Sequence, residues 1–253
     1  MPKNGLRAFA FPTEGNFVLI TLKSILLISI LGGIVSVDRR TSLRLMISQP
    51  LFTGLVVGLL LGDARDGFIF GAVYQTILLG VVSTRGSRLP DLWIGGVVGT
   101  ALFVVLRKSS GADPAVMGLS TAYAVFVAVI VGVIAGAVYR VWESRSDFLA
   151  DLSMELIERE KVQMVSALHV SMIAFHLLFG AVLTFIFIIS SMPLNDKLLG
   201  FSGMDRLVSL KYLEILIPFI GIGFLVNLLA GRGKYFWFAA GFLVTVVLVN
   251  ALG

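Results

Sequence analysis

The sequence predicts an all-α integral membrane protein, and three observations carry this prediction. Of the 253 residues, 57% are hydrophobic and 14% are charged, whereas soluble domains carry roughly 25% charged residues. The mean hydropathy is +0.97. Long runs without a charged side chain recur along the chain. Because a soluble fold of this length cannot bury so much apolar surface, these observations exclude a cytosolic globular enzyme and a disordered chain.

Runs free of Asp, Glu, Lys and Arg define the expected membrane segments. A spanning helix needs about 20 apolar residues, with a range of about 17–25. Residues 1–16 are expected to form a short N-terminal tail, because a polar break precedes the first apolar stretch and no clear cleavage site follows it. The remainder, 17–253, is expected to be a single polytopic domain with about seven to eight hydrophobic segments. Five runs are each long enough for one span: 45–62, 67–84, 114–139, 215–231 and 235–253.

The other three runs do not have the length of one straight span. The run 24–37 reaches that length only by extending back through Lys23 to Phe17. The run 92–106 is short, which is compatible with a tilted span or with a re-entrant hairpin protected by protein. The run 162–195 is longer than one span requires, so it either begins as an interfacial helix or breaks near Gly180.

A polar segment over 140–161 separates two of these runs. Its apolar residues recur at helical spacing beside a stripe of acids, which predicts an amphipathic helix: Phe148, Leu149, Leu152, Leu156 and Ile157 against Asp147, Asp151, Glu155 and Glu158. It is either a solvated connector or a contact surface for a partner.

The Gly-rich stretches 50–62 and 218–231 resemble each other. The likeness is either an internal repeat or a chance similarity.

Charge and cysteine content narrow the function further. The formal net charge is +5, but the basic residues are distributed over short loops, as is usual for membrane proteins, so nucleic acid is not an expected partner. The chain has no cysteine and two histidines, which excludes a thiolate metal site and a cysteine nucleophile. No Walker loop, dinucleotide fingerprint or serine-nucleophile elbow is present. Neither a metal nor another cofactor is therefore predicted.

Polar side chains within apolar segments are the candidate binding residues, because such groups are energetically expensive in a membrane. The amide of Gln75 suits sugar hydroxyls, or else joins two helices. Gln49 precedes Pro50 at an expected helix start and is a weaker candidate. Asp91 precedes the short run 92–106, where its carboxylate suits capping of that helix, hydrogen bonding to a sugar, or both. Asn227 lies inside 215–231 and suits interhelical hydrogen bonding or substrate.

His169 and His176 are seven residues apart, which places them on one helical face. They are candidates for a proton relay, although hydrogen-bonded packing is the commoner role of such residues. Glycines spaced four apart, such as Gly54, Gly58 and Gly62, predict close helix contacts.

Several of these residues belong to a pattern that resembles a known family. The pattern consists of PLFTGLVVGLLLGD at 50–63, GFIFG at 67–71, then Gln75, Gly80 and Pro90-Asp91. It looks like the membrane subunit IIC of the mannose/fructose/sorbose-type phosphotransferase system. The His169-Val170 pair, Val226-Asn227 and the aromatic run from Tyr235 are also similar to that family. The resemblance covers about residues 17–250, and the block from Leu61-Gly62-Asp63 to Gly80 is its most specific part.

This resemblance implies a sugar-translocating subunit in a bacterial cytoplasmic membrane. It implies a second membrane subunit, IID, as partner in a trimer of IIC–IID pairs, and an elevator-like movement of a core against a scaffold. Soluble IIA and IIB would relay phosphate, and IIB would phosphorylate the hexose. The IIC subunit itself would take no phosphate, so the chain is not expected to be a catalyst.

The sequence departs from the family pattern at a few positions. Gln75 stands where glutamate is common, Arg85 and Arg88 lie in a stretch that is usually uncharged, and leucine precedes Pro90 in place of alanine. Two other functions therefore remain open from the sequence. One is a IIC-like structural or regulatory subunit that does not transport. The other is a secondary carrier independent of the phosphotransferase system, with a histidine in proton coupling.

Overall fold

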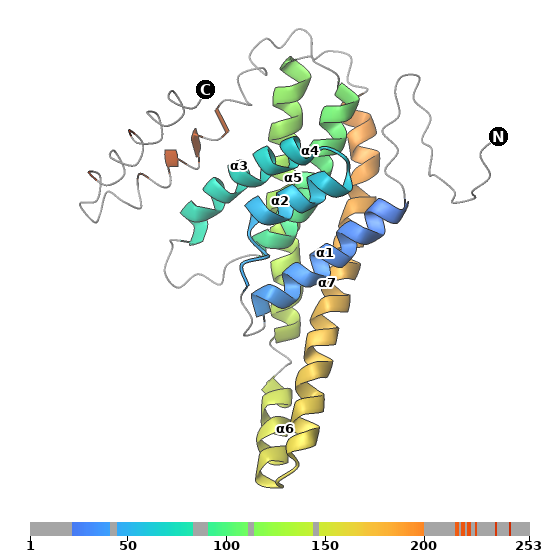
Figure 1. Cartoon of the computed structure of the whole chain (residues 1–253), viewed down its shortest axis with the longest axis vertical. Helices are drawn as coiled ribbons and strands as arrows, with labels where there is room; N and C mark the ends of the chain where they lie inside the picture. The colour runs from blue at the N-terminus through green and yellow to red at the C-terminus, as the bar shows by residue number, and fades with distance from the viewer. Residues whose placement is uncertain are drawn as a thin grey trace, which may run out of the picture.

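The fold is helical throughout the part of the chain that the structure describes (Figure 1). The computed structural model describes residues 22–40, 45–82, 91–110, 114–143 and 147–199, and the single positions 216, 217, 219, 220, 222, 223, 226, 236 and 243. The expected tail, most of the runs 215–231 and 235–253, and with them most of the second copy of the possible repeat, therefore lie outside the described residues. The helices are α1 (Leu22–Arg40), α2 (Pro50–Leu60), α3 (Ala64–Val82), α4 (Leu92–Ser110), α5 (Pro114–Glu143), α6 (Asp147–Glu158) and α7 (Val162–Leu199).

Helix α4 is the centre of the bundle. Residues 91–104 are all buried, and α4 packs against α1, α2, α3, α5 and α7. Its 19 residues extend about 28 Å at about 1.5 Å per residue. The re-entrant hairpin considered for the run 92–106 is therefore wrong, because one continuous helix occupies it. In a continuous helix the backbone N–H and C=O groups of the interior turns are hydrogen-bonded to one another, so the chain needs no hairpin to pair them.

Glycines allow the helices to pair at backbone contact. In the α2–α3 pair, a methyl group on Gly54 would lie 2.5 Å from the Gly67 carbonyl oxygen. In the α4–α5 pair, a methyl group on Gly132 would lie 2.7 Å from the Leu92 Cα. In the α1–α7 pair, a methyl group on Gly180 would lie 2.5 Å from the Ser36 Cβ. The close helix contacts predicted from small residues are thus present in three pairs.

The α2–α3 pair is an antiparallel hairpin. Pro50 begins α2, where its missing N–H is not needed. Gly62 lies in the turn between α2 and α3 with a φ of 74°, which glycine adopts without strain. Residues 45–49 and 61–62 of the run 45–62 form turns, so α2 has only 11 residues and is about 16 Å long. A hydrocarbon core is about 30 Å thick. The expectation that 45–62 forms one straight span is therefore wrong.

Helix α7 is continuous and forms a projecting arm with α6. It runs through Gly180 without interruption for 38 residues, so the break considered there is wrong; the missing side chain of Gly180 instead admits α1. The predicted amphipathic helix is α6, which packs beside the N-terminal half of α7 at one end of the molecule (Figure 1). Glu160, with a φ of 56°, turns the chain between α6 and α7.

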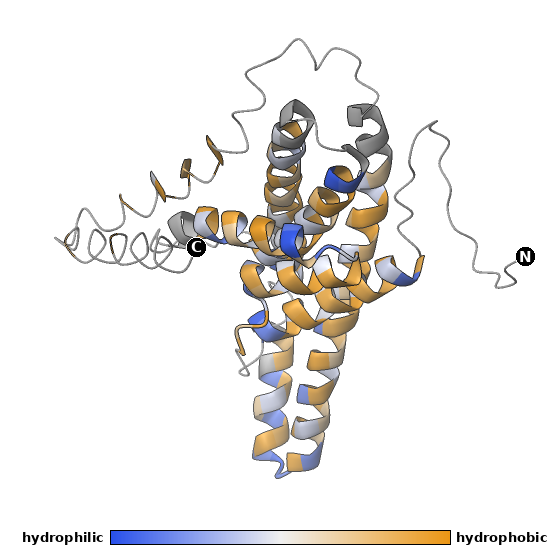
Figure 2. Cartoon of the chain, turned by 45° about the horizontal axis from the view of Figure 1, so that its top comes forward, coloured by the Kyte–Doolittle hydropathy of each residue, from blue (hydrophilic) through white to orange (hydrophobic). Residues whose placement is uncertain are grey.

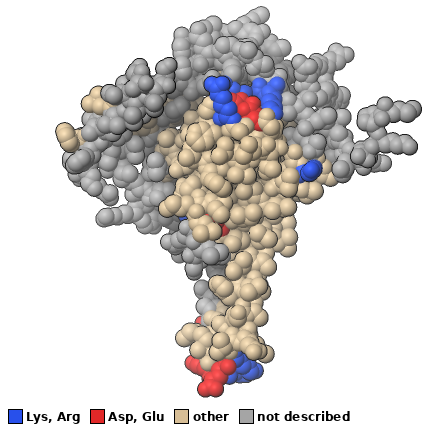
Figure 3. Space-filling view, in the orientation of Figure 1, with Lys and Arg blue, Asp and Glu red and all other residues tan. Residues whose placement is uncertain are grey.

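The outer surface is largely apolar. Hydrophobic residues face outward on α5 and α7 as well as inward (Figure 2), including Phe126, Val133, Val170, Leu178 and Ile186. Charged residues gather at one end of the molecule and at the tip of the α6–α7 arm, with a mostly uncharged face between them (Figure 3). Of the described helices, two are long and apolar enough to cross a membrane, over Gly118–Trp142 and Val162–Met192. The expected number of spans stays a prediction.

Candidate functional site

The starts of α2 and α4 and the C-terminal half of α3 meet at one end of the bundle. The Tyr74 hydroxyl donates to the Leu92 carbonyl oxygen at 3.1 Å, which ties α3 to the start of α4. A methyl group on Gly96 would touch both the Tyr74 ring and the Pro50 side chain. Three predicted site residues, Gln49, Gln75 and Asp91, are therefore at this end, although no contact joins their side chains to one another among the described interactions.

Gln75 joins the two helices of the hairpin. Its Oε1 accepts a hydrogen bond from the backbone N–H of Leu51 at 3.0 Å. Leu51 lies in the first turn of α2, where the backbone N–H groups lack a partner within the helix. Gln75 is half-buried. The interhelical role weighed for this amide is thus present.

Gln49 precedes α2 with extended backbone angles. Its side chain makes no capping hydrogen bond, whereas its backbone carbonyl oxygen accepts from the N–H groups of Phe52 and Thr53, both at 2.9 Å. The preceding turn is held by Asp38 near the end of α1, whose carboxylate accepts from Leu45 N at 2.6 Å and from Ser48 N at 3.0 Å. Asp38 thereby positions the start of α2.

Asp91 forms a buried ion pair with Arg40, the last residue of α1. The Arg40 Nη2 and Asp91 Oδ2 atoms are 2.6 Å apart, and the Asp91 and Arg40 side chains are 4% and 15% exposed. Asp91 Oδ1 is buried and has no hydrogen-bond partner among the described residues. The capping interpretation of Asp91 is therefore wrong, because its carboxylate faces Arg40 and accepts no hydrogen bond from the described part of α4.

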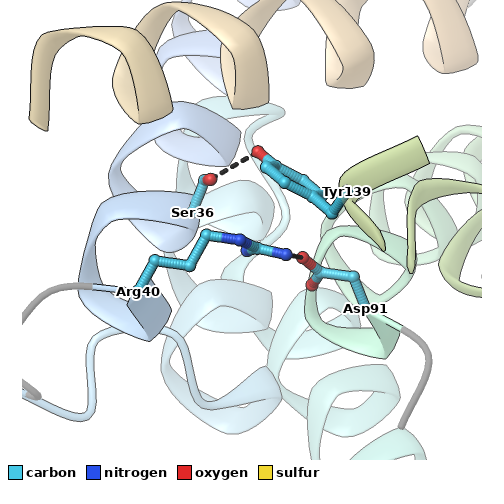
Figure 4. Close-up of polar contacts among 4 residues, drawn as sticks. All are labelled: Ser36, Arg40, Asp91 and Tyr139. Atoms are coloured by element: carbon cyan, nitrogen blue, oxygen red, sulfur yellow. Dashed lines mark hydrogen bonds and ion pairs between the residues drawn. The ribbon is translucent and has the colours of Figure 1, made fainter. Parts of the chain in front are cut away.

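Two further side chains complete a polar cluster that joins three helices, and we call it the Arg40 cluster: Ser36, Arg40, Asp91 and Tyr139 (Figure 4). The Arg40 guanidinium carbon lies 3.3 Å from the centroid of the Tyr139 ring, within the range of a cation–π contact. The Tyr139 hydroxyl and the Ser36 hydroxyl are hydrogen-bonded at 2.5 Å. Sequence reasoning missed Ser36, Arg40 and Tyr139. The signal that could have found Arg40 is the need of a buried aspartate for a cation.

The two histidines do not share an environment. His176 is buried, and its ring centroid lies 6.2 Å from that of Tyr139. His169 is exposed, on the part of α7 that forms the arm with α6. No described contact joins the two imidazoles, so the proton relay stays a prediction. Asn227 lies outside the described residues. Among the described residues, no group of three His, Asp or Glu side chains could hold a metal ion.

The Leu61-Gly62-Asp63 motif forms the turn at the opposite end of α4. The Lys108 Nζ donates to the Leu61 carbonyl oxygen at 2.5 Å, and the Arg107 Nε lies 3.3 Å from Asp66 Oδ2. The Asp63 carboxylate accepts from the Asp66 N–H at 3.1 Å, which caps α3. The motif thus ends α2, begins α3 and fastens the hairpin to α4.

Replacing Asp63 with alanine is expected to destabilise the chain, because it removes the cap of α3. Loss of such a cap costs about 1 kcal/mol. The measurement is the thermal unfolding midpoint of the detergent-purified protein. Asp151→Ala, at an exposed position of α6, is the matched control and is expected to leave the midpoint unchanged. An equal fall in both variants would contradict the capping role.

Comparisons with known proteins agree over most of the chain. Residues 22–252 match the family described as the PTS system sorbose-specific IIC component. A provisionally named N-acetylgalactosamine permease IIC component 2 of Escherichia coli strain K12 is 30% identical over 109 residues, which are 43% of this chain and 78% of that relative. The mannose-specific EIIC component of the PTS system from the same strain is 31% identical over 64 residues, which are 25% of this chain and 24% of that relative.

A solved structure shares the fold. It is described as a membrane protein and superposes with a TM-score of 0.59 over 92% of this chain and 93% of its own, at 18% identity. This likeness shows a shared fold; the family match and the apolar outer surface identify the chain as a membrane protein.

Proposed function

The chain belongs to the sorbose-type IIC family of the phosphotransferase system, a family of membrane components of sugar transport, and from this membership we propose that it carries a hexose inward for phosphorylation by a separate IIB subunit. A IID membrane subunit is the proposed partner, in a trimer of IIC–IID pairs, and IIA supplies phosphate to IIB. The proposed location is the bacterial cytoplasmic membrane, which the chain crosses several times.

The observation that carries this proposal is the gathering of Gln49, Gln75 and Asp91 at one end of the bundle, beside the starts of α2 and α4. Amide and carboxylate groups hydrogen-bond sugar hydroxyls without requiring a charge on the substrate. The residues proposed to bind sugar are Gln75 and Asp91, with Gln49 and Asn227 as further candidates. Binding by a few such bonds is modest, because each contributes only about 0.5–1.5 kcal/mol.

A second candidate function is a structural subunit without transport. It is favoured by the fact that the Gln75 Oε1 and the Asp91 Oδ2 atoms already contact groups of this chain. If these contacts are permanent, the same polar side chains serve only to hold helices together. The two functions differ in whether uptake responds to these residues when the fold is intact.

Uptake by membrane vesicles tests the proposed function. Vesicles containing the chain with its IID partner are supplied with labelled mannose or labelled N-acetylgalactosamine, with and without phosphorylated IIB. The expected result is sugar phosphate inside the vesicles only when IIB is present. Uptake without IIB would indicate a secondary carrier. Well-assembled complexes that take up neither sugar would favour the structural subunit.

Replacing Gln75 with alanine is expected to lower uptake about threefold to tenfold, the effect of one lost hydrogen bond. The adjacent Thr76 provides a matched control, because its hydroxyl donates within α3, to the Val73 carbonyl oxygen at 2.7 Å. Thr76→Ala is expected to transport normally. Uptake is measured at equal amounts of assembled complex. Normal uptake by Gln75→Ala would show that Gln75 does not bind the sugar.

A further inference from the structure

Asp91 is proposed to bind sugar, yet its carboxylate is buried and engaged by Arg40. We propose that Arg40 is a built-in competitor of the sugar: it holds the Asp91 carboxylate when no sugar is present and has to leave it before a sugar hydroxyl binds there. This inference rests on the proposed function. It adds that one residue of the chain, Arg40, lowers the affinity of the protein for its substrate.

The two partners differ in how freely they can move. Asp91 directly precedes α4 and is followed by a run of buried residues, so its backbone is held by the centre of the bundle. Arg40 is the last residue of α1 and reaches Asp91 with a long side chain. Its guanidinium can therefore leave by rotation about its own bonds, without displacing a helix. Arg40 is the member of the pair that exchanges.

Tyr139 provides a place for the displaced arginine. The guanidinium already lies over the Tyr139 ring, 3.3 Å from its centroid, and an aromatic face attracts a cation without a carboxylate. The hydrogen bond between Tyr139 and Ser36 fixes that ring against α1, the helix that carries Arg40. Figure 4 shows the guanidinium between the Tyr139 ring and the Asp91 carboxylate. Arg40 can thus give up Asp91 and keep its contact with Tyr139.

Competition of this kind sets the apparent affinity. A site that is free for only a fraction of the time shows a dissociation constant raised by the inverse of that fraction. Weakening the hold of Arg40 on Asp91 should therefore improve binding, whereas removing the carboxylate should impair it. The two members of one ion pair are expected to change KM in opposite directions. A pair with a purely structural role would impair transport in both cases.

The test is the KM for uptake of labelled mannose and labelled N-acetylgalactosamine by vesicles containing the chain with its IID and phosphorylated IIB partners. Arg40→Gln is expected to lower KM about threefold to tenfold. Asp91→Asn keeps the shape of the side chain and is expected to raise KM by about tenfold. In the double variant, Arg40→Gln should have no further effect, because no carboxylate remains to compete for.

Stability is followed in parallel by size-exclusion elution and thermal midpoint. If Arg40→Gln fails to assemble, Arg40→Lys replaces it. The lysine keeps the charge but has no planar guanidinium to hold the carboxylate or stack on Tyr139, so it is expected to lower KM by a smaller factor.

Each outcome has a distinct meaning. Opposite changes in KM, with no effect of the arginine substitution in the Asp91→Asn background, would support the inference. An unchanged or raised KM in assembled Arg40→Gln or Arg40→Lys would overturn it while leaving sugar transport intact. No saturable uptake of either sugar by the wild-type assembly would contradict the proposed function and, with it, this inference.

Discussion

Replacing Gly67 with alanine is expected to prevent stable pairing of α2 and α3. The added methyl group would lie 2.6 Å from the Gly58 Cα and 2.8 Å from the Gly58 N, and closer still to the Gly54 carbonyl oxygen. All three atoms belong to the backbone of α2, so no side-chain rotation relieves the overlap and the helices have to separate. Overpacking typically costs about 1–3 kcal/mol, and this site lies at the upper end because only backbone atoms are met.

The measurement is the thermal unfolding midpoint of the detergent-purified chain, which is expected to fall by roughly 6–12 °C. Gly223→Ala is the matched control, because a methyl group there meets no atom of the described residues within 4 Å. Since alanine is the better helix former, that variant should be at least as stable as the wild type. A midpoint for Gly67→Ala equal to that of the control would contradict the backbone contact between α2 and α3.

Replacing Asp91 with alanine is expected to destabilise the chain strongly. The substitution leaves the Arg40 guanidinium, with its side chain only 15% exposed, without its carboxylate. Removing one partner of a buried ion pair typically costs about 3–5 kcal/mol, because the remaining charge is buried without compensation. The yield of folded, monodisperse protein and its thermal midpoint are the measurements, and both should fall.

A double substitution separates the ion pair from the rest of the packing. Replacing Arg40 with methionine and Asp91 with leucine removes both charges and keeps similar volumes, a change that is often neutral or stabilising in other proteins. The double variant is therefore expected to recover the stability lost in Asp91→Ala but to transport no sugar. If Asp91→Ala were as stable as the wild type, the ion pair would contribute little to the fold.

The class of the protein and the identity of several helices could be predicted from the sequence. Charge-free apolar runs predict membrane helices because a bilayer admits few other structures. The amphipathic pattern in the segment 140–161 predicts a helix, which the structure places at Asp147–Glu158 as α6. The Leu61-Gly62-Asp63 motif is also interpretable locally, since a glycine with positive φ and a capping aspartate act within one turn. The family resemblance rests on this motif and is confirmed by the match over residues 22–252.

The lengths of helices were less predictable than their existence. The run 45–62 has the composition of a span, but the turns at Pro50 and Gly62 shorten α2 to 11 residues. Gly180 was a candidate helix break, yet its role is to admit α1 against α7. In both cases the sequence shows which residues are apolar or small. The packing of the neighbouring helix determines whether such a residue ends a helix or forms a close contact.

The sequence by itself therefore determined that this chain is a helical membrane protein of the IIC type and that Gln75 and Asp91 are polar groups in apolar surroundings. Only the tertiary structure decided what those groups contact. Arg40 and Asp91 are brought within 2.6 Å by packing of α1 beside α4, and Tyr139 reaches Arg40 from α5. The periodicity of a sequence describes the faces of one helix at a time. An ion pair between residues of two helices depends on how the helices are placed. That placement is set by close glycine contacts and by the burial of many side chains together.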